Sequence, residues 1–583
     1  KVNGKWQKLY LKALSLNAFK PGEKKYTRDY TYYESLINEL VSIGANCVRA
    51  KDIMPAEFYR AIYQNNKDNS SKTIYLIQSI TAPDGLSAGE YLDGIAKWQE
   101  KIEKTVMAVH GDGNMPATEN MNSTSYFNDV SPYLLALIIE PNLTAENAEI
   151  IEKSNSTFSY SGKYFASSSA VSSFCAELCD IAQAKNNDAY GYKIPIGINI
   201  DANLIANYKY AQGKVKYDLS NLTLSDEDKA YYFLSISGSL SQSAFSSNAK
   251  HYGKNDYGDA FAKYLKEVKA AINAPLIVNG ISVSTNIGSN TESEQSQKLI
   301  EALNSAESAT CIGAIINDLN DDWSAVSSKM YPYTVPLANN YLWHNVTDSS
   351  QTTGLVAIES PTPKTSNLEY FDDDRMQGMS VSANESYLYI NLRLLEDVDY
   401  SKEEFFVGID TYQRNDGDYY YSKDYTPTSL SGMEFVIRFK DKQNAGLYVI
   451  NSYDKNKGNL SSKESYSGKY NLVSKLNYGG FRSGDNQFYT TGTTTYIRIP
   501  WALLNVTDPS QKVVINNEGK LENQVKTTQT NGFLISLMIA DKSTKDLLYM
   551  FPETKKDPGY KTFKWSTWEE VTFEYREKDG FQT

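Results

Sequence analysis

Two apolar runs in this sequence end in polar residues that could carry out chemistry. Residues 133–139 are followed by Glu140 and, two positions on, by Asn142, and residues 275–278 are followed by Asn279. Runs of this kind fit strands that are buried on both faces, as in a parallel sheet covered by helices. The carboxyl ends of the strands of a (β/α) barrel form its active-site face, so we expect these three residues there. A pair of carboxylates at that face could act as acid, base or nucleophile, whereas amides could only bind.

The first 350 residues alternate strand-like and helix-like segments, which predicts a (β/α)8 TIM barrel. Eight strands are expected at residues 9–17, 46–50, 73–79, 134–139, 194–200, 230–236, 276–279 and 312–316. Helices are expected at 26–43, 54–65, 87–106, 170–185, 257–272 and 292–305, with a last helix near 335–343. A doubly wound open sheet is the alternative, but no Gly-rich phosphate loop follows any of the strands.

The second half of the chain has a different pattern. Residues 351–370 include Pro361 and Pro363 in a polar stretch, which is typical of a linker. Residues 371–583 then show strands of period two separated by turn residues, at 386–392, 404–411, 433–439, 446–451, 495–499 and 532–540. This pattern predicts an all-β sandwich domain.

Composition limits the classes of function. At 583 residues the chain is long enough for at least two domains, and its net charge of −12 argues against nucleic-acid or anionic-membrane partners. No transmembrane segment is expected, because no apolar stretch approaches the roughly 18 residues that a span needs. Three histidines and four cysteines are too few and too scattered to favour a metal site, and no cofactor is expected.

A resemblance to a known family rests on several segments of the predicted barrel. They include Gly44-Ala-Asn-Cys-Val-Arg49, Pro55-Ala-Glu-Phe-Tyr-Arg-Ala61, Ile74-Tyr-Leu-Ile-Gln78, Val109-His-Gly111, Asp129-Val-Ser-Pro-Tyr-Leu-Leu135 and Tyr160-Ser-Gly-Lys-Tyr-Phe165. In these segments the chain resembles retaining glycosidases of the large barrel clan. More narrowly, it resembles barrel domains found beside glycosyltransferases in polysaccharide loci of Gram-positive bacteria. The resemblance implies catalytic glutamates at the ends of strands four and seven, and a location outside the cell or on its surface.

The chain departs from that family pattern at both glutamate positions. The end of strand four is Asn142, or an isoleucine if a gap is allowed, with Glu140 as the only nearby acid. The end of strand seven is Asn279. An amide can be neither a carboxylate nucleophile nor a general acid–base near neutral pH.

Two further positions differ from the family pattern. The aromatic and histidine residues expected after strand six are replaced by the segment Ser237-Gly-Ser239. After strand eight the chain has Asn317-Asp318-Leu319 in place of an aromatic–acid–Trp pattern, although Trp323 still matches. These departures predict a pseudo-glycosidase that does not hydrolyse.

Hydrolysis or transglycosylation by relocated carboxylates remains an alternative. The acids at expected strand ends are Asp52, Glu140, Asp201, Asp318, Asp321 and Asp322. The other interpretation of these residues is that they are solvated loop charges or helix N-caps. Arg49, at the end of strand two, resembles the arginine that braces the family's nucleophile. Here it could pair with Asp52 or Asp318, or hold a ligand.

The second domain carries a resemblance of its own. The segments Tyr387-Leu-Tyr-Ile390, Val407-Gly-Ile-Asp-Thr411, Gly432-Met-Glu-Phe435 and Ile497-Arg-Ile-Pro-Trp501 resemble the family-9-type carbohydrate-binding fold. The resemblance implies loops that hold a sugar between aromatic rings. The candidates are Tyr412, Trp501, Trp565 and Trp568, with burial in the sandwich core as the alternative. Asp372-Asp-Asp374 could contact calcium or form an acidic loop.

Together these features predict an extracellular or cell-surface protein of a Gram-positive-type bacterium. Its expected partner is a polysaccharide or another cell-envelope glycan, bound without hydrolysis. The alternatives are an active glycosidase and a structural surface protein that self-associates.

Overall fold

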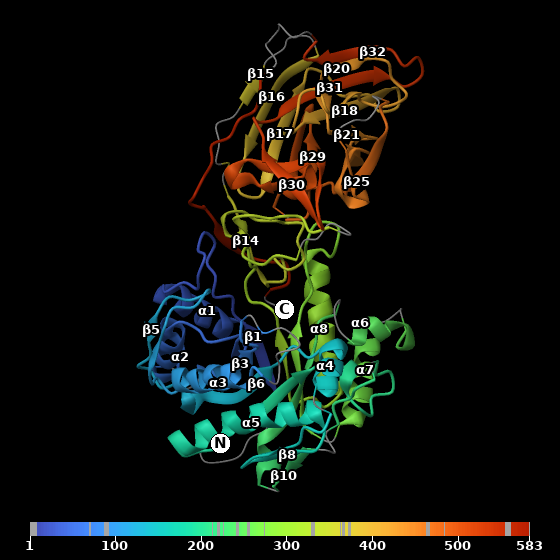
Figure 1. Cartoon of the computed structure of the whole chain (residues 1–583). Helices are drawn as coiled ribbons and strands as arrows, with labels where there is room; N and C mark the ends of the chain where they lie inside the picture. The colour runs from blue at the N-terminus through green and yellow to red at the C-terminus, as the bar shows by residue number, and fades with distance from the viewer. Residues whose placement is uncertain are drawn as a thin grey trace.

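The computed structural model describes residues 9–581 except 69–71, 85, 87–92, 155, 213, 219–221, 226, 241–243, 254–256, 273, 328–332, 362, 364–367, 371–374, 462–466, 483 and 554–560. It places a (β/α)8 barrel at one end of the molecule and a β-sandwich at the other, with strand β14 (Val356–Glu359) between them (Figure 1). Both predicted fold classes are confirmed. The predicted helix near 335–343 is wrong, because within it only the short 3-10 turn Asn340–Leu342 forms.

Eight parallel strands close the barrel in the order β1-β13-β12-β11-β9-β6-β3-β2. They are β1 (Leu11–Ser15), β2 (Cys47–Ala50), β3 (Tyr75–Thr81), β6 (Leu134–Glu140), β9 (Ile196–Ile200), β11 (Tyr232–Ser237), β12 (Leu276–Ile281) and β13 (Gly313–Ile316). The outer helices are α1 (Tyr30–Ser42), α2 (Ala56–Asp68), α3 (Ile95–Val109), α4 (Ala145–Ser154), α5 (Ala170–Tyr190), α6 (Ala244–Asn248), α7 (Tyr257–Ala271) and α8 (Glu292–Ser308).

Local sequence sets where these helices begin and end. Thr291 and Glu294 form a capping box at the start of α8, since each side chain accepts a hydrogen bond from the other residue's backbone N–H. Helix α5 ends at Tyr190 and is capped by Gly191, which adopts a φ of 84° in the left-handed region.

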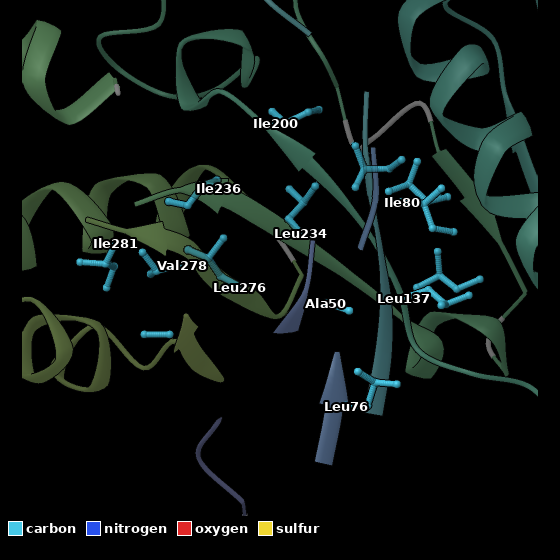
Figure 2. Close-up of a cluster of buried hydrophobic side chains, with 14 of the residues drawn as sticks. Ala50, Leu76, Ile80, Leu137, Ile200, Leu234, Ile236, Leu276, Val278 and Ile281 are labelled. Atoms are coloured by element: carbon cyan, nitrogen blue, oxygen red, sulfur yellow. The ribbon is translucent and has the colours of Figure 1, made fainter. Parts of the chain in front are cut away.

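Successive side chains along each barrel strand alternate between the helices and the lumen. The helix-facing side chains include Leu76, Ile80, Leu137, Leu234 and Val278, which belong to the large buried cluster drawn in Figure 2. The lumen holds a separate apolar layer of Ala13, Cys47, Ile77, Ala136, Ile138, Phe233, Ile277 and Ile315. Phe233 fits because residue 197 is glycine: a Cβ there would lie 2.3 Å from its ring. The lumen is therefore packed below the strand ends.

The sandwich consists of a five-stranded sheet, β15-β16-β17-β27-β26, and a six-stranded sheet, β25-β22-β21-β18-β31-β32. The first contains β15 (Leu368–Tyr370), β16 (Met376–Ala383), β17 (Tyr387–Leu394), β27 (Thr494–Pro500) and β26 (Phe488–Thr491). The second contains β25 (Tyr470–Leu476), β22 (Ala445–Ile450), β21 (Phe435–Phe439), β18 (Glu403–Asp410), β31 (Leu534–Asp541) and β32 (Leu547–Phe551).

The end of the chain returns from the sandwich to the barrel. Strand β33 (Glu574–Glu577) pairs antiparallel with β14 (Val356–Glu359), which lies inside the predicted linker. Lys578 follows β33, and its Nζ lies 2.9 Å from Asp321 Oδ1, with both side chains 3% exposed. This return segment, residues 574–581, joins the two domains by sheet pairing and by a buried ion pair.

Candidate functional site

A layer of polar side chains lies above the apolar layer of the barrel lumen. Each of the eight strands, or the residue directly after it in the case of β13, contributes one residue: Ser15, Arg49, Ser79, Glu140, Asn199, Ser235, Asn279 and Asn317. Seven of them lie two positions beyond an apolar lumen residue, and Asn199 lies two positions beyond Gly197. Hydrogen bonds connect them around the carboxyl ends of the strands. We call this set the mouth layer.

Arg49 is the centre of one half of the mouth layer. Its Nη2 pairs with Glu140 Oε1, and its Nε donates to Ser79 Oγ at 2.8 Å. Its Nη1 donates to Ser15 Oγ at 3.1 Å and to Asn317 Oδ1 at 3.2 Å. The guanidinium is thus held in a fixed orientation, and it compensates the one carboxylate of the layer. The predicted pairing of Arg49 with Asp52 or Asp318 is wrong. The Arg49 side chain points into the lumen and pairs with Glu140 on strand β6.

Asn279 connects the other half of the layer to the same carboxylate. Its Nδ2 donates to Glu140 Oε1 at 3.2 Å and to Asn199 Oδ1 at 3.4 Å. Ser235 Oγ donates to Asn199 Oδ1 at 2.9 Å. Asn279 Oδ1 is buried with no hydrogen-bond partner among the described residues. It is therefore a buried acceptor for which the described residues supply no donor.

The other predicted acids are held by partners of their own. Asp318 Oδ1 lies 2.6 Å from Lys51 Nζ, and Asp52 Oδ2 lies 2.6 Å from Lys101 Nζ. Because each has a cation beside it, neither carboxylate forms a pair with Glu140 in this arrangement.

Two further acids serve as local caps. Asp322 Oδ1 accepts a hydrogen bond from the backbone of Ser324 at 2.9 Å, and Asp201 Oδ1 accepts one from the backbone of Asn203 at 2.8 Å. Burial raises the pKa of both carboxyls above their ordinary values. Asp201 is the N-cap of the short 3-10 helix Ala202–Leu204, which matches the N-cap interpretation, whereas Asp322 caps a turn.

Three predicted residues are not members of the layer. Asn142 is exposed, with a φ of 51°, so it is a turn residue beyond β6 rather than the end of that strand. Ser237 is half-buried and ends β11, paired in register with Asn279. Trp323 is buried where the barrel meets β14, and its Nε1 donates to the carbonyl of Ile358 at 3.2 Å.

The four aromatic candidates of the sandwich are buried. Trp501 has no exposed surface; its Nε1 donates to Asn384 O at 2.9 Å and its ring centroid lies 5.0 Å from that of Trp565. Trp568 Nε1 donates to Leu342 O at 2.9 Å, and Tyr412 packs in the same core. These rings close the core and do not offer a face to a sugar. The candidate calcium residues, 372–374, lie outside the described residues.

The sequence interpretation missed most of the mouth layer. Ser15, Ser79, Asn199, Ser235 and Asn317 are not among the predicted site residues, although four of them follow an apolar lumen residue at a spacing of two and Asn199 follows Gly197 at the same spacing. That period-two step, applied to all eight strands, was the signal that could have identified them. Among the described residues, no group of three or more His, Cys, Asp and Glu side chains could hold a metal ion.

Comparisons with known proteins give fold-level likeness. No protein-family model and no curated protein matches the chain. Among solved structures, a β-glucuronidase from an uncultured Clostridium species is 12% identical with a TM-score of 0.33, covering 56% of this chain and 44% of that one. An endo-laminarinase from Formosa is 10% identical, with a TM-score of 0.36 and coverage of 60% and 83%. A Ruminococcus champanellensis endoglucanase with bound cellotriose is 10% identical, with a TM-score of 0.33 and coverage of 54% and 89%.

These similar proteins are glycosidases by name, and the present chain spans less than half of the length of the first of them. Their identities and TM-scores are too low to assign an activity to this chain. No helix in the described part of the chain is long and apolar enough to cross a membrane.

Proposed function

We propose that this protein binds glycans at the cell envelope without hydrolysing them. The observation that carries the proposal is the hydrogen bond from Asn279 Nδ2 to Glu140 Oε1 at 3.2 Å. It joins the ends of strands four and seven of the barrel, where the sequence resemblance implies two glutamates.

Retaining hydrolysis needs two carboxyl groups about 5–5.5 Å apart with a sugar between them. Here one position is an amide, and that amide contacts the remaining carboxylate directly. Glu140 is also paired with Arg49 in a buried site, so this carboxylate already has a cation as its partner. Loss of a catalytic nucleophile typically lowers a rate by at least about 10³-fold.

The same geometry is suited to binding. The mouth layer contains hydroxyl, amide, guanidinium and carboxylate groups, which are the groups that recognise sugar hydroxyls, and most of these side chains are buried. The buried Asn279 Oδ1 supplies an acceptor without a described partner. The cell-envelope location is part of the proposal and is supported by the sequence resemblance.

Retention on insoluble polysaccharides, combined with an assay for released reducing ends, tests this function. We expect the protein to be retained on at least one bacterial envelope polysaccharide and to release no reducing ends. A protein unfolded by heat serves as the control for non-specific adsorption. Failure to be retained on any polysaccharide of the panel contradicts the proposal.

A second candidate function, self-association as a structural surface protein, has one observation in its favour. Strand β32 is an edge of the six-stranded sheet, and its residues Leu547 and Leu548 are 42% and 48% exposed. An exposed edge with apolar side chains is a template for pairing with another chain. Sedimentation of the wild type and of Leu548→Lys distinguishes the two functions: concentration-dependent oligomers that the lysine abolishes would support assembly.

A further inference from the structure

A cavity of about 320 Å³ lies between the barrel and the sandwich. We call it the junction cavity. It is bounded by barrel loops that include His344, by the paired strands β14 and β33, and by sandwich residues that include Tyr387 and Phe481. Figure 1 shows β14 at this level, between the two domains. The volume is at the lower end of the roughly 300–1,000 Å³ typical of small-molecule sites. The cavity therefore has room for a terminal sugar unit rather than a long polymer segment.

Negative charge prevails in the junction cavity. Five carboxylates and three cations line the cavity, which leaves a formal excess of two negative charges. The carboxylates are Glu292, Asp321, Glu359, Asp485 and Glu574. The cations are Arg498, Arg576 and Lys578. A low-dielectric pocket with such an excess attracts a cation and repels an anion.

The pairing pattern shows where this excess arises. Arg576 Nη2 lies 2.6 Å from Glu292 Oε1 and 2.8 Å from Glu359 Oε1, so one guanidinium serves two carboxylates. Lys578 is committed to Asp321. Arg498 Nε donates to the carbonyl of Asn486 at 2.7 Å, and its guanidinium lies 4.6 Å from the ring centroid of Tyr387.

His344 supplies an independent sign of a ligand. Its side chain lines the cavity and is 6% exposed, yet Nε2 has no hydrogen-bond partner among the described residues. Its ring stacks on Trp323 at a centroid distance of 5.2 Å, which fixes its orientation. Burial lowers the pKa of His344 to about 3, so the imidazole is neutral near neutral pH. A neutral imidazole nitrogen either donates or accepts, and a hydroxyl group can satisfy both tautomers.

Other cavity groups are suited to hydroxyls. Ser360 Oγ and Ser386 Oγ face each other at 3.3 Å, and the ring of Tyr389 adds an apolar wall. A metal ion is a poor occupant, because the described residues hold no group of three or more ligating side chains that could bind one. The occupant must therefore combine hydroxyl groups with a positive charge.

We propose that the junction cavity binds a cationic amino sugar, as the terminal unit of a glycan. This inference rests on the proposed glycan-binding function and names a site for it. The ammonium group lies near the carboxylates that share Arg576, and ring hydroxyls bond to His344 and to the serine hydroxyls. A uronic acid of the same ring size is excluded by the charge of the cavity.

Calorimetric titration of the full chain with D-glucosamine, D-glucose and D-glucuronate near neutral pH tests the site. These probes share one ring and differ in charge. We expect D-glucosamine to bind about tenfold more tightly than D-glucose, as one favourable charge contact implies, and D-glucuronate to bind more weakly than either. Equal affinity of the wild type for all three sugars, or no binding of D-glucosamine, would overturn the proposal.

Variants then locate the site. Glu359→Gln, which keeps shape and removes one charge, is expected to abolish most of the preference for D-glucosamine over D-glucose. His344→Phe keeps an aromatic ring against Trp323. It is expected to weaken the binding of D-glucosamine and of D-glucose by the same factor. Glu119→Gln, an exposed change on the barrel, serves as the matched control and leaves binding unchanged. Wild-type affinity for D-glucosamine and wild-type preference over D-glucose in both cavity variants would place the sugar elsewhere.

The polysaccharide retention assay separates the two proposals. If the wild type and both cavity variants are retained equally, the junction cavity is not the site and glycan binding stands. If the wild type itself is not retained on any polysaccharide, glycan binding fails as well.

Discussion

Asn279 on β12 donates a hydrogen bond to Glu140 on β6 at 3.2 Å across the carboxyl face of the barrel. Both side chains are buried, and Arg49 pairs with the same carboxylate. The two strand ends therefore hold each other directly, where a retaining glycosidase would keep two carboxylates apart for a sugar.

The Arg49–Glu140 pair makes the barrel sensitive to loss of either charge. Arg49→Met leaves a buried carboxylate uncompensated, and we expect it to lower the free energy of unfolding by about 3–5 kcal/mol. The double variant Arg49→Met, Glu140→Met removes both charges and should recover most of that loss. Urea denaturation measures both changes. A single variant as stable as the wild type would show that the ion pair is not formed.

Glu434 makes sandwich stability depend on pH. Burial, together with the neighbouring Asp410, raises the pKa of the Glu434 carboxyl well above its ordinary value. An acid whose folded pKa is raised contributes stability that is fully present below its unfolded pKa, about 4.3, and is lost as pH rises. Glu434→Gln cannot ionise, so we expect its melting temperature to exceed that of the wild type by an amount that grows from acidic to neutral pH.

Thermal melts over that pH range measure the Glu434 effect. Glu396→Gln, on an exposed side chain of the sandwich, is the control and should follow the wild-type curve. Parallel curves for Glu434→Gln and the wild type would mean that Glu434 is ionised in the folded protein.

Lys578 holds the return segment against the barrel. Lys578→Met leaves Asp321 buried without its cation, and we expect it to cost about 3–5 kcal/mol of stability. It should also expose residues 574–581 to proteases. Asp321→Asn combined with Lys578→Met should cost less than Lys578→Met alone, because no unpaired charge remains. Limited proteolysis followed by mass spectrometry shows the effect, and an unchanged cleavage pattern in Lys578→Met would contradict it.

Trp501 tests whether the sandwich tryptophans are core residues or ligand residues. It has no exposed surface and donates to Asn384 O at 2.9 Å, so Trp501→Ala should lower stability by about 3–5 kcal/mol. The exposed Tyr478, changed to Ala, is the control and should have little effect on the melting temperature. A stable Trp501→Ala variant that loses glycan binding would instead favour the sugar-stacking role.

The sequence was sufficient to predict the barrel strands, because apolar runs of four to eight residues alternate with amphipathic helices along the first domain. It also indicated that position 279 is an amide near the carboxyl end of a strand, although β12 continues to Ile281. The partner of Arg49 could not be predicted. Its pairing with Glu140 depends on the register that aligns Thr81 with Glu140 and Ser15 with Arg49, and register is a property of the closed sheet.

The sandwich tryptophans show the same limit. The sequence offered both an exposed sugar-binding role and a core role for Trp501, and only tertiary packing against Phe533 and Trp565 distinguishes them. The junction cavity was beyond sequence reasoning altogether, because it combines residues near 344, 387 and 576 that meet only after the chain returns to the barrel.

Turnover of a panel of 4-nitrophenyl glycosides and envelope polysaccharides, measured for the wild type and for Glu140→Gln, shows whether the barrel hydrolyses glycans. We expect the wild type to release no more product than the variant does, since Glu140 is bound to Arg49 and Asn279 and has no second carboxylate across a sugar. Cleavage by the wild type that Glu140→Gln abolishes would contradict the account.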